Sequence, residues 1–372
     1  MEEEYYEYWF ANVEGIRADR KRSIRKCIGS AKAIYNIEET ILSAPLRENL
    51  SDREVSKIKE SRKKKDWKKE YAHLAEKGIR FIPWHSPDYP ARFDSLPGMP
   101  YALYLKGHLP KEERISAAIV GARRCSAYGE RMTLEFAEAL AEAGIQIISG
   151  MARGIDGFAH RGALNVGGMT CAVLGCGTDI CYPREHKGLY QDLERKGGIV
   201  SEFPPGTPPL PSNFPARNRI ISALADIVLV MEAREKSGSL ITADLALEQG
   251  RDVYALPGPV TEELSRGTNN LIRQGAGILL NPQEMLDELG IQSKKEEEKE
   301  GTDTDRKKGK NKIMLESIEN LVYSKLGLYP RNQEELLQEA HLAPQELAGI
   351  LVSLELKGYI SEVSKNYYIR RV

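Results

Sequence analysis

Glycine-rich turns that carry arginine, serine and asparagine recur in the middle of the 372-residue chain. They read GARRCSAYG (121–129), SGMARGIDGFAH (149–160), GCGTDICYPREHK (175–187) and EAREKSGSLITA (232–243). Glycine permits positive φ and lets a ligand approach the backbone, and the start of a helix offers free N–H donors. The chemistry that these turns indicate is the binding of anionic oxygens, above all those of phosphates.

Basic and aromatic side chains accompany the turns and define a candidate site for a polynucleotide. The residues that we assign to it are Gly121, Arg123, Arg124, Gly150, Arg153, Gly177, Tyr182, Arg184, Lys187, Asn213, Phe214, Arg217, Asn218, Arg219, Ser237, Gly238 and Ser239. Phe214 and Tyr182 could stack on unpaired nucleobases, which would favour single strands. We expect charge reversal at Arg123 or Arg217 to abolish binding and to leave the fold intact.

Each assignment has a structural alternative. Candidate ion pairs within the protein join Arg217 or Arg219 to Asp226 or Glu232. The aromatic residues could likewise anchor a turn or belong to the core. The convergence of all these residues on one edge of the predicted sheet favours binding.

Two common phosphate-binding motifs do not occur in the sequence. The dinucleotide fingerprint requires G-x-G-x-x-G after the first strand and an acidic residue at the end of the second. Here Gly121 is followed by Arg123 and Arg124, and the second strand ends in Ser149 and Gly150. No G-x-x-x-x-G-K-[ST] is present either. The sequence therefore disfavours NAD and ATP, and we expect no cofactor.

Catalytic and metal-binding interpretations are less well supported. Asp156 and His160 could form an acid/base pair, but a helix cap at Asp156 above a packed His160 is the simpler account. Ser237 and Ser239 flank Gly238 without a His/Asp arrangement that would make a nucleophile. The other histidines lack the spacing of metal ligands. We therefore expect neither catalytic residues nor a metal site.

Alternating strands and helices must position the turns. Strand-like runs lie at 115–120, 145–148, 171–174, 198–202, 227–231 and 252–256, with helical segments near 128–143, 155–166, 184–196, 217–224 and 239–249. Uncharged strands separated by amphipathic helices indicate a parallel sheet covered on both faces. The sequence thus predicts an α/β, Rossmann-like (extended), doubly wound and mostly parallel sheet. Ligands bind beyond the carboxyl ends of such strands, which we name the strand-exit edge.

Further modules flank this predicted sheet. We predict a helical N-terminal domain (1–78), the extended Rossmann-like domain (79–291), a charged disordered linker (292–312) and a winged-helix-like domain (313–372). The N-terminal part resembles bundles related to sterile-alpha-motif and helix-hairpin-helix domains, and a helix predicted over 52–77 carries a basic cluster. In the last domain the presumed recognition helix, 344–357, carries Glu346 and Glu355 and only Lys357 as a base. That balance favours contact with protein over contact with DNA.

Composition limits the class of protein. Lys+Arg number 53 and Asp+Glu 54, so the positive charge for a polyanion must be gathered locally. Five cysteines without a Cys-x-x-Cys pair indicate reduced thiols. The acidic, aromatic N-terminus and the lack of an apolar run of ~20 residues disfavour export and membrane insertion. We expect a cytoplasmic protein.

Eight ordered blocks carry a resemblance to a known family. They read YPARFDSLPGMPYALYLKG, VGARRCSAYG, SGMARGIDGFAH, AVLGCGTDICYP, SEFPPGTPP, FPARNRIISAL, SGSLITADLALEQGRDVYALPG and GTNNLIRQGA. Together they resemble the bacterial DNA-processing protein A family, also called DprA or Smf. The family's commonest first turn is Gly-Ser-Arg, and Ala122 here replaces the serine. That change removes one hydroxyl donor and leaves the backbone donors in place.

The resemblance implies a function as well as a fold. It implies a protein that binds single-stranded DNA, protects incoming DNA and helps load the RecA recombinase, in natural transformation or in general recombination. It also implies a homodimer through the Rossmann-like domain, with no chemical reaction. By position the family's basic residues fall on Arg123, on Arg184 or Lys187, and on the block from Arg217 to Arg219.

Two other functions remain open at this level. Related Rossmann-like enzymes hydrolyse nucleotide-ribose phosphates with a P-G-G-x-G-T-x-x-E loop. Here only Leu256-Pro257-Gly258-Pro259 stands in a similar place, without the later glycines or the glutamate. The third possibility is a pure scaffold, which would show no affinity for DNA.

Overall fold

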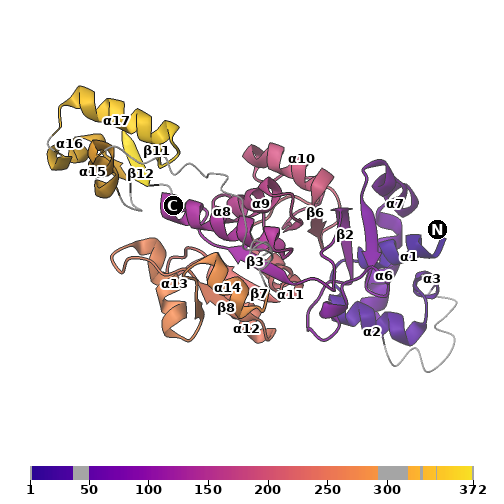
Figure 1. The fold of residues 1–372 in the computed structure, drawn as a ribbon. Coiled ribbons are helices and arrows are strands. Elements are labelled where there is room, and N and C mark those ends of the chain that lie inside the picture. The colour runs from indigo at the N-terminus through magenta and orange to yellow at the C-terminus, as the bar shows by residue number, and fades with distance from the viewer. Residues whose placement is uncertain (1, 37–49, 292–316, 327–329, 341, 371–372) are drawn as a thin grey trace, which may run out of the picture. The chain divides into compact units, whose positions relative to one another are not determined.

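The computed structural model describes residues 2–36, 50–291, 317–326, 330–340 and 342–370 (Figure 1). The chain divides into two compact units, Met1–Ser293 and Lys294–Val372. The predicted linker over 292–312 lies outside the described residues. The domain boundaries drawn from the sequence remain predictions.

A nine-stranded sheet forms the centre of the first unit, in the order β1-β2-β6-β5-β4-β3-β7-β8-β9. The strands are β1 (Arg80–Pro83), β2 (Ala102–Gly107), β3 (Ser116–Val120), β4 (Gln146–Ser149), β5 (Thr170–Val173), β6 (Gly198–Ser201), β7 (Ile227–Val230), β8 (Asp252–Ala255) and β9 (Gly277–Ile278). Pairing is parallel from β6 through to β9, whereas β2 runs antiparallel to both β1 and β6. The predicted mostly parallel α/β sheet is therefore confirmed.

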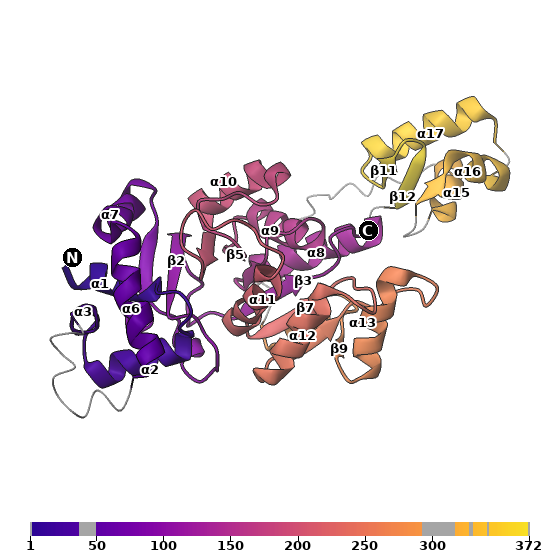
Figure 2. The same cartoon turned by 180° about the vertical axis from the view of Figure 1, so that it is seen from behind.

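Helices cover both faces of this sheet (Figures 1 and 2). They are α8 (Ala127–Glu142), α9 (Ile155–Asn165), α10 (Lys187–Lys196), α11 (Asn213–Leu224), α12 (Gly238–Glu248), α13 (Glu263–Arg273) and α14 (Pro282–Glu288), with short 3₁₀ turns η1 (Ala91–Phe93) and η2 (Arg184–His186). Side chains alternate between the faces of a strand. In β3, Ala117 and Ile119 share an apolar core with α8 and α9, and Ala118 and Val120 share one with α11 and α12. The alternation explains why these short, uncharged strands are buried on both sides.

The chain reverses its direction across the sheet at β3. It passes from β3 outward through β4, β5 and β6, and then returns to β7 on the other side of β3. Such a switch point opens a crevice beyond the carboxyl ends of the strands, where open α/β sheets bind ligands. The topology thus places the turns that follow β3 and β7 side by side.

The N-terminal helices pack on the antiparallel end of the sheet. They are α1 (Glu2–Ala11), α2 (Ala18–Ile28), α3 (Ala31–Tyr35), α6 (Asp52–Lys64) and α7 (Trp67–Glu76). Trp9 and Phe10 share a core with Tyr101, which directly precedes β2, and with Tyr104, which lies in β2. No strand was predicted before residue 115, so β1 and β2 were missed. One face of β2, with Tyr104, packs on these helices, and the other face, with Leu103, packs in the core shared with α11.

One predicted helix, over 52–77, is in fact two. Lys65 is extended, with φ −151° and ψ 158°, so α6 ends at Lys64. The side chain of Asp66 then accepts a hydrogen bond from the backbone N–H of Lys69 and caps α7. The lysines on both sides are good helix formers, which hid the capping aspartate within a helical pattern.

The second unit has three helices and a three-stranded sheet. Its elements are α15 (Ser317–Lys325), β10 (Arg331–Asn332), α16 (Gln333–Ala340), α17 (Pro344–Leu356), β11 (Ile360–Ser364) and β12 (Tyr367–Arg370). The sheet runs in the order β10-β12-β11, and Leu336, Leu347, Leu351 and Ile360 form its buried core. The winged-helix order predicted from the sequence is confirmed.

Across the described residues, none of the helices combines the length and the apolar character needed to cross a membrane.

Candidate nucleic-acid interface

A groove of about 610 Å³ lies at the strand-exit edge, at the switch point between β3 and β7. Ten of the residues assigned from the sequence line it: Gly121, Arg123, Arg124, Tyr182, Phe214, Arg217, Asn218, Ser237, Gly238 and Ser239. Five basic side chains and one carboxylate, Asp156, are among its lining residues. Excess positive charge in a concave site concentrates field lines and attracts anions.

An aromatic stack stands at one side of the groove. The rings of Tyr182 and Phe214 have their centroids 5.5 Å apart with their planes inclined by 32°. The guanidinium of Arg123 lies over the Phe214 ring, 5.5 Å from its centroid. Tyr182 is 41% exposed, so its outer face is free to receive another planar group. The stack therefore joins a cation to an open aromatic surface.

Small residues make room for this stack. A Cβ on Gly175 would lie 3.0 Å from the Phe214 ring. The side chain of Asn213 donates to the carbonyl of Gly175 at 3.1 Å and fixes the start of α11 against the turn after β5. Asn213 does not line the groove itself; it positions Phe214.

The helix start after β3 is already occupied by a carboxylate. Glu232 is buried and accepts hydrogen bonds from the backbone N–H and the hydroxyl of Ser126, at 2.9 and 2.5 Å. Ser126 is the N-cap residue of α8, so Glu232 occupies the place where a dinucleotide enzyme holds pyrophosphate. Glu232 forms no ion pair with Arg217 or Arg219, contrary to the alternative drawn from the sequence.

The start of α12, in contrast, opens into the groove. Gly238 is the first residue of α12, and a Cβ added to it would meet no atom within 4 Å. Its neighbours Ser237 and Ser239 share a hydrogen bond of 2.7 Å between their hydroxyls. The N–H groups of Ser239 and Leu240 bond to the hydroxyl and the carbonyl of Ser237, so the N–H of Gly238 and the two hydroxyls are what this helix N-terminus offers to an anionic oxygen.

Arg217 is buried beneath the groove, with only 4% of its surface exposed. Its guanidinium donates to the carbonyls of Gly150, at 2.7 Å, and Val173. A Cβ on Gly150 would lie 2.5 Å from that guanidinium, so Gly150 is required for the arginine to fit. Burial lowers the pKa of Arg217, and the nearby carboxylate of Asp156 opposes that shift. Reversing the charge at Arg217 would therefore disturb the fold, contrary to our expectation from the sequence.

Several other assigned residues are held within the protein. Arg219 binds both carboxylate oxygens of Glu202, at 2.9 and 2.7 Å, and not Asp226. The amide of Asn218 donates to the carbonyl of Gly238 at 3.1 Å and joins α11 to the start of α12. Arg153 forms an exposed ion pair with Glu185 beside a small hollow of about 40 Å³, which Gly150 also lines.

Besides Asn213 and Arg219, three more assigned residues line neither hollow. Arg184 and Lys187 are exposed at η2 and the start of α10, and line neither hollow. Gly177 is buried, and a Cβ there would approach the carbonyl of Pro204 at 2.9 Å. Gly177 therefore serves the packing of the turn.

The candidate acid/base pair is divided between different partners. The imidazole Nδ1 of His160 lies 2.6 Å from the hydroxyl of Thr170, and burial lowers the pKa of His160 to about 3. Asp156 accepts from the backbone N–H of Ala152 at 3.3 Å, and burial raises its pKa. The N-cap of α9 is Gly154, so the cap that we expected at Asp156 is wrong by two positions.

Sequence reasoning missed two basic residues of the groove, Arg234 and Lys236. Both follow β7, in the same turn as the serines that were identified. The guanidinium of Arg234 forms an ion pair with the carboxylate of Glu263 at 3.3 Å, and Lys236 is exposed. The signal was available, since the turn reads EAREKSGS and both bases stand within five residues of Gly238.

Two family models match the chain, one in each of the two units. Residues 80–290 match the family described as DNA recombination-mediator protein A, and residues 308–364 match the DprA winged helix domain. The chain is 48% identical over 217 residues to Protein Smf of Escherichia coli (strain K12). That alignment covers 58% of this chain and 58% of the relative, so the chain matches little more than half the length of that curated relative.

Two solved structures are similar to the chain. DNA processing protein A from Streptococcus pneumoniae is 32% identical, with a TM-score of 0.63, over 76% of this chain and 97% of that one. DNA processing protein A from Helicobacter pylori, described for its single-stranded DNA binding mode, is also 32% identical, with a TM-score of 0.52. This second match covers 57% of the present chain and 95% of the other.

Proposed function

The chain belongs to the DNA recombination-mediator protein A family, and from that premise we propose that its strand-exit edge binds single-stranded DNA. The observation that carries the proposal is the stack of Arg123, Phe214 and Tyr182 over a groove lined by five basic residues. The relative from Helicobacter pylori, named for its single-stranded DNA binding mode, supports the same ligand.

The groove can hold a strand by two kinds of contact. Exposed Arg123, Arg124 and Lys236 would neutralise phosphates, and the open start of α12 would donate its Gly238 N–H and its serine hydroxyls to them. The outer face of Tyr182 would stack on a nucleobase. A base in a duplex is already stacked and paired, so this contact favours an unpaired strand.

We further propose that the protein acts without a chemical step. The buried groups that could have served as acid and base, Asp156 and His160, each have a structural hydrogen-bond partner. The loop after β8 lacks the glutamate of the phosphoribohydrolase-like enzymes, as the sequence already indicated. Binding and release of DNA would then be the whole activity of this edge.

The recombination role extends the proposal to partners. A mediator would protect incoming or exposed single strands and deliver them to the RecA recombinase in the cytoplasm, in natural transformation or general recombination. A homodimer formed through the Rossmann-like domain would lengthen the DNA footprint. The family match and the relatives' names as DNA-processing proteins support this role.

Charge reversal at Arg123 tests the proposed site. Its guanidinium is exposed, so Arg123→Glu should leave the unfolding midpoint unchanged. Loss of a charge-assisted contact worth ~1.5–3 kcal/mol should weaken binding of a single strand of ~35 nucleotides by about 10- to 100-fold. Fluorescence anisotropy at several salt concentrations measures this loss. Arg53→Glu, on the exposed side of α6, is the matched control. Equal affinities of wild type and Arg123→Glu would reject the site.

A further inference from the structure

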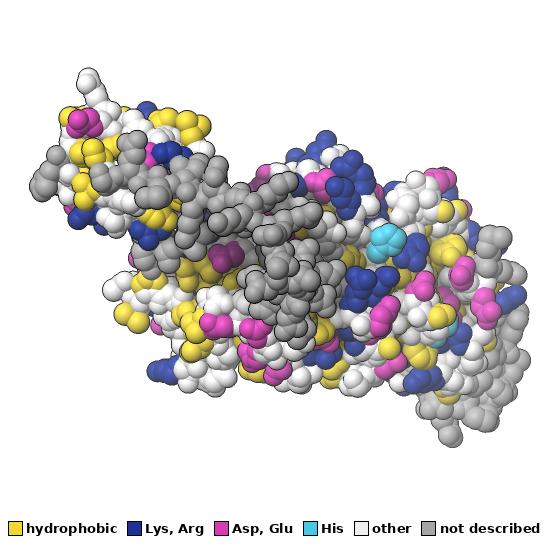
Figure 3. Space-filling model, in the orientation of Figure 1, with side chains coloured by type: hydrophobic (Ala, Val, Ile, Leu, Met, Phe, Trp, Pro, Cys, Tyr) yellow, Lys and Arg dark blue, Asp and Glu magenta, His cyan; other side chains and the backbone are white. Residues whose placement is uncertain are grey.

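A second basic groove lies at the opposite edge of the sheet, where the parallel strands begin. Two hollows of about 450 and 400 Å³ share Arg114, Met169 and Lys196 as lining residues, so they adjoin. We name them together the amino-edge groove. Its charged lining residues are Arg80, Lys111, Arg114 and Lys196, with the carboxylates Asp88 and Glu142. Figure 3 shows Lys and Arg side chains gathered around α10, β6 and β2.

A buried glutamine holds the loop that carries two of these bases. Gln146, at the start of β4, is 1% exposed and accepts from the backbone N–H of Lys111 at 2.7 Å. Its amide nitrogen donates to the carbonyls of Lys111 and Arg114, at 2.9 and 3.3 Å, and lies 3.2 Å from the hydroxyl of Ser116. The loop backbone is therefore fixed by a side chain of the sheet.

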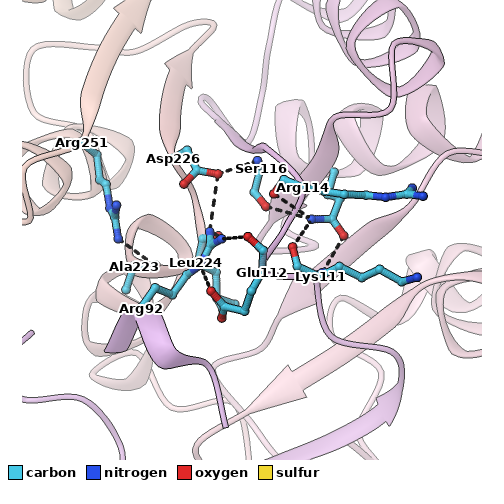
Figure 4. Close-up of polar contacts among 10 residues, drawn as sticks. Arg92, Lys111, Glu112, Arg114, Ser116, Ala223, Leu224, Asp226 and Arg251 are labelled. Carbon is cyan, nitrogen blue, oxygen red and sulfur yellow. Dashed lines mark hydrogen bonds and ion pairs between the residues drawn. The ribbon is translucent and has the colours of Figure 1, made fainter. Parts of the chain in front are cut away.

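The same network engages the neighbouring carboxylates. Arg92 binds the carboxylate of Glu112 at 3.1 Å and that of Asp226 at 3.6 Å. Asp226 also accepts from the backbone N–H of Ser116 at 2.8 Å. Figure 4 shows Lys111 and Arg114 extended side by side, away from this network. Of the two acids of the loop, Glu112 thus lies toward Arg92 and Glu113 is exposed, while the two bases point outward.

Glycines bring the remaining bases to the same place. A Cβ on Gly198 would lie 1.8 Å from the carbonyl of His108, and one on Gly107 would lie 2.3 Å from that of Gly197. This close approach joins the end of β2 to the end of α10, where Lys196 lies. Arg80 donates to the carbonyl of Gly107 at 3.4 Å and lies 3.4 Å from Asp88, so it is partly neutralised. Within the described residues, Lys111, Arg114 and Lys196 show no ion pair.

We propose that the amino-edge groove binds the sugar-phosphate backbone of a second DNA segment, either single-stranded or duplex. Among its lining residues there is no Phe, Tyr or Trp, so it has cations for phosphates and no ring for a base. Phosphate contacts carry no information about base or strand number. Aromatic anchors are also what a protein partner would use, and their absence favours a polyanion.

The inference rests on the proposed function in one respect. A strand held at the strand-exit edge would raise the local concentration of any DNA attached to it, so a weaker second site becomes useful. The amino-edge groove itself is defined by other residues. The experiments can therefore confirm one of the two binding sites and reject the other.

A duplex titration on the full chain tests the second site. Unlabelled oligo-dT is first added at the concentration that just fills the strand-exit edge, the tighter site for a single strand. A fluorescent duplex of about 20 base pairs is then titrated at several salt concentrations. The Arg114→Glu/Lys196→Glu double variant should bind the duplex at least ~10-fold more weakly, with a log–log salt slope shallower by about 2. Its affinity for oligo-dT should change by less than about two-fold.

A control variant separates the groove from net charge. Arg53→Glu/Lys365→Glu makes the same change in charge at two exposed residues outside the groove and should leave duplex affinity unchanged. Because Arg114 and Lys196 are exposed, both double variants should unfold at the wild-type temperature. Unchanged duplex affinity in the Arg114→Glu/Lys196→Glu variant would overturn the inference, and so would an equal loss in the control.

Two further results complete the test. Displacement of the duplex by polyglutamate at equal charge would show a site for acidic protein and would overturn the assignment to DNA. The Arg123→Glu variant should lose affinity for oligo-dT and keep its affinity for the duplex. If Arg123→Glu keeps oligo-dT while Arg114→Glu/Lys196→Glu loses the duplex, the amino-edge groove stands and the proposed single-strand site fails.

Discussion

The strand-exit edge and the outward face of α17 are both places where their folds commonly meet nucleic acid, yet their chemistry differs. The strand-exit groove is lined by five bases, and its aromatic ring Tyr182 is open to solvent. α17 itself contains no Lys or Arg, and its exposed side chains include Val352 and Leu356, 57% and 84% exposed. A fold thus supplies a position, whereas its side chains determine what binds there.

The two regions also use their bases differently. Lys357, which follows α17, lies 2.5 Å from Glu319, so its charge is offset within the unit. Arg123 at the strand-exit edge lies over an aromatic ring, where its guanidinium edge stays available. A recognition helix that enters DNA must present polar or basic side chains to bases and phosphates. α17 contains no Lys or Arg, and the exposed polar side chains on it include the acidic Glu346 and Glu355, which agrees with the sequence-based preference for protein contact.

The largest effect should come from removing the buried arginine under the strand-exit groove. Arg217→Ala would leave the carbonyls of Gly150 and Val173 without this donor and would leave Asp156 buried without its nearby cation. We expect the free energy of unfolding to fall by about 3 kcal/mol. Urea denaturation measures it.

The exposed neighbour Arg123 provides the contrast for this variant. Arg123→Ala should change the free energy of unfolding by less than ~0.5 kcal/mol. A comparable loss of stability in both variants, or no loss in Arg217→Ala, would mean that buried Arg217 does not stabilise the strand-exit edge.

Removing the open ring should have an intermediate effect. Stacking on an aromatic ring is worth ~1–3 kcal/mol per base, so Tyr182→Ala should weaken single-strand binding about 10-fold. Duplex binding should change little. Tyr182→Phe keeps the ring and is the matched control, with affinity close to wild type. Titrations of both variants against single strand and duplex give the result, and an equal loss in Tyr182→Phe would assign the effect to the hydroxyl.

The sequence predicted the sheet more fully than the site. The six strands that form the parallel part up to β8 were placed within about one residue, because uncharged β-branched runs between helices are strongly periodic. The strands β1, β2 and β9 were missed: two precede the alternating pattern, and β9 has only two residues. Local patterns cannot reveal strands whose burial depends on distant helices.

Within the site, side-chain type was easier to predict than burial. Ten assigned residues do line the groove, because the carboxyl ends of parallel strands meet at one edge. Arg217 and Arg219 read alike in the sequence, but one is buried on two carbonyls and the other is paired with Glu202. Those partners lie 67 and 17 positions away along the chain, so spacing alone could not separate the two roles.

The smallest effect should come from adding charge to α17. Val352→Lys and Leu356→Lys place bases on its exposed face, so stability should change by less than ~0.5 kcal/mol. If that face lies away from DNA, affinity for single strand and duplex should rise by no more than about two-fold in the full chain. Leu247→Lys, on α12 of the other unit, measures the general effect of one added charge. A rise of ~10-fold in the α17 variants beyond that control would place α17 on DNA, because each new phosphate contact also steepens the salt dependence. The strand-exit edge and α17 would then differ in how tightly they bind DNA, and no longer in whether they bind it.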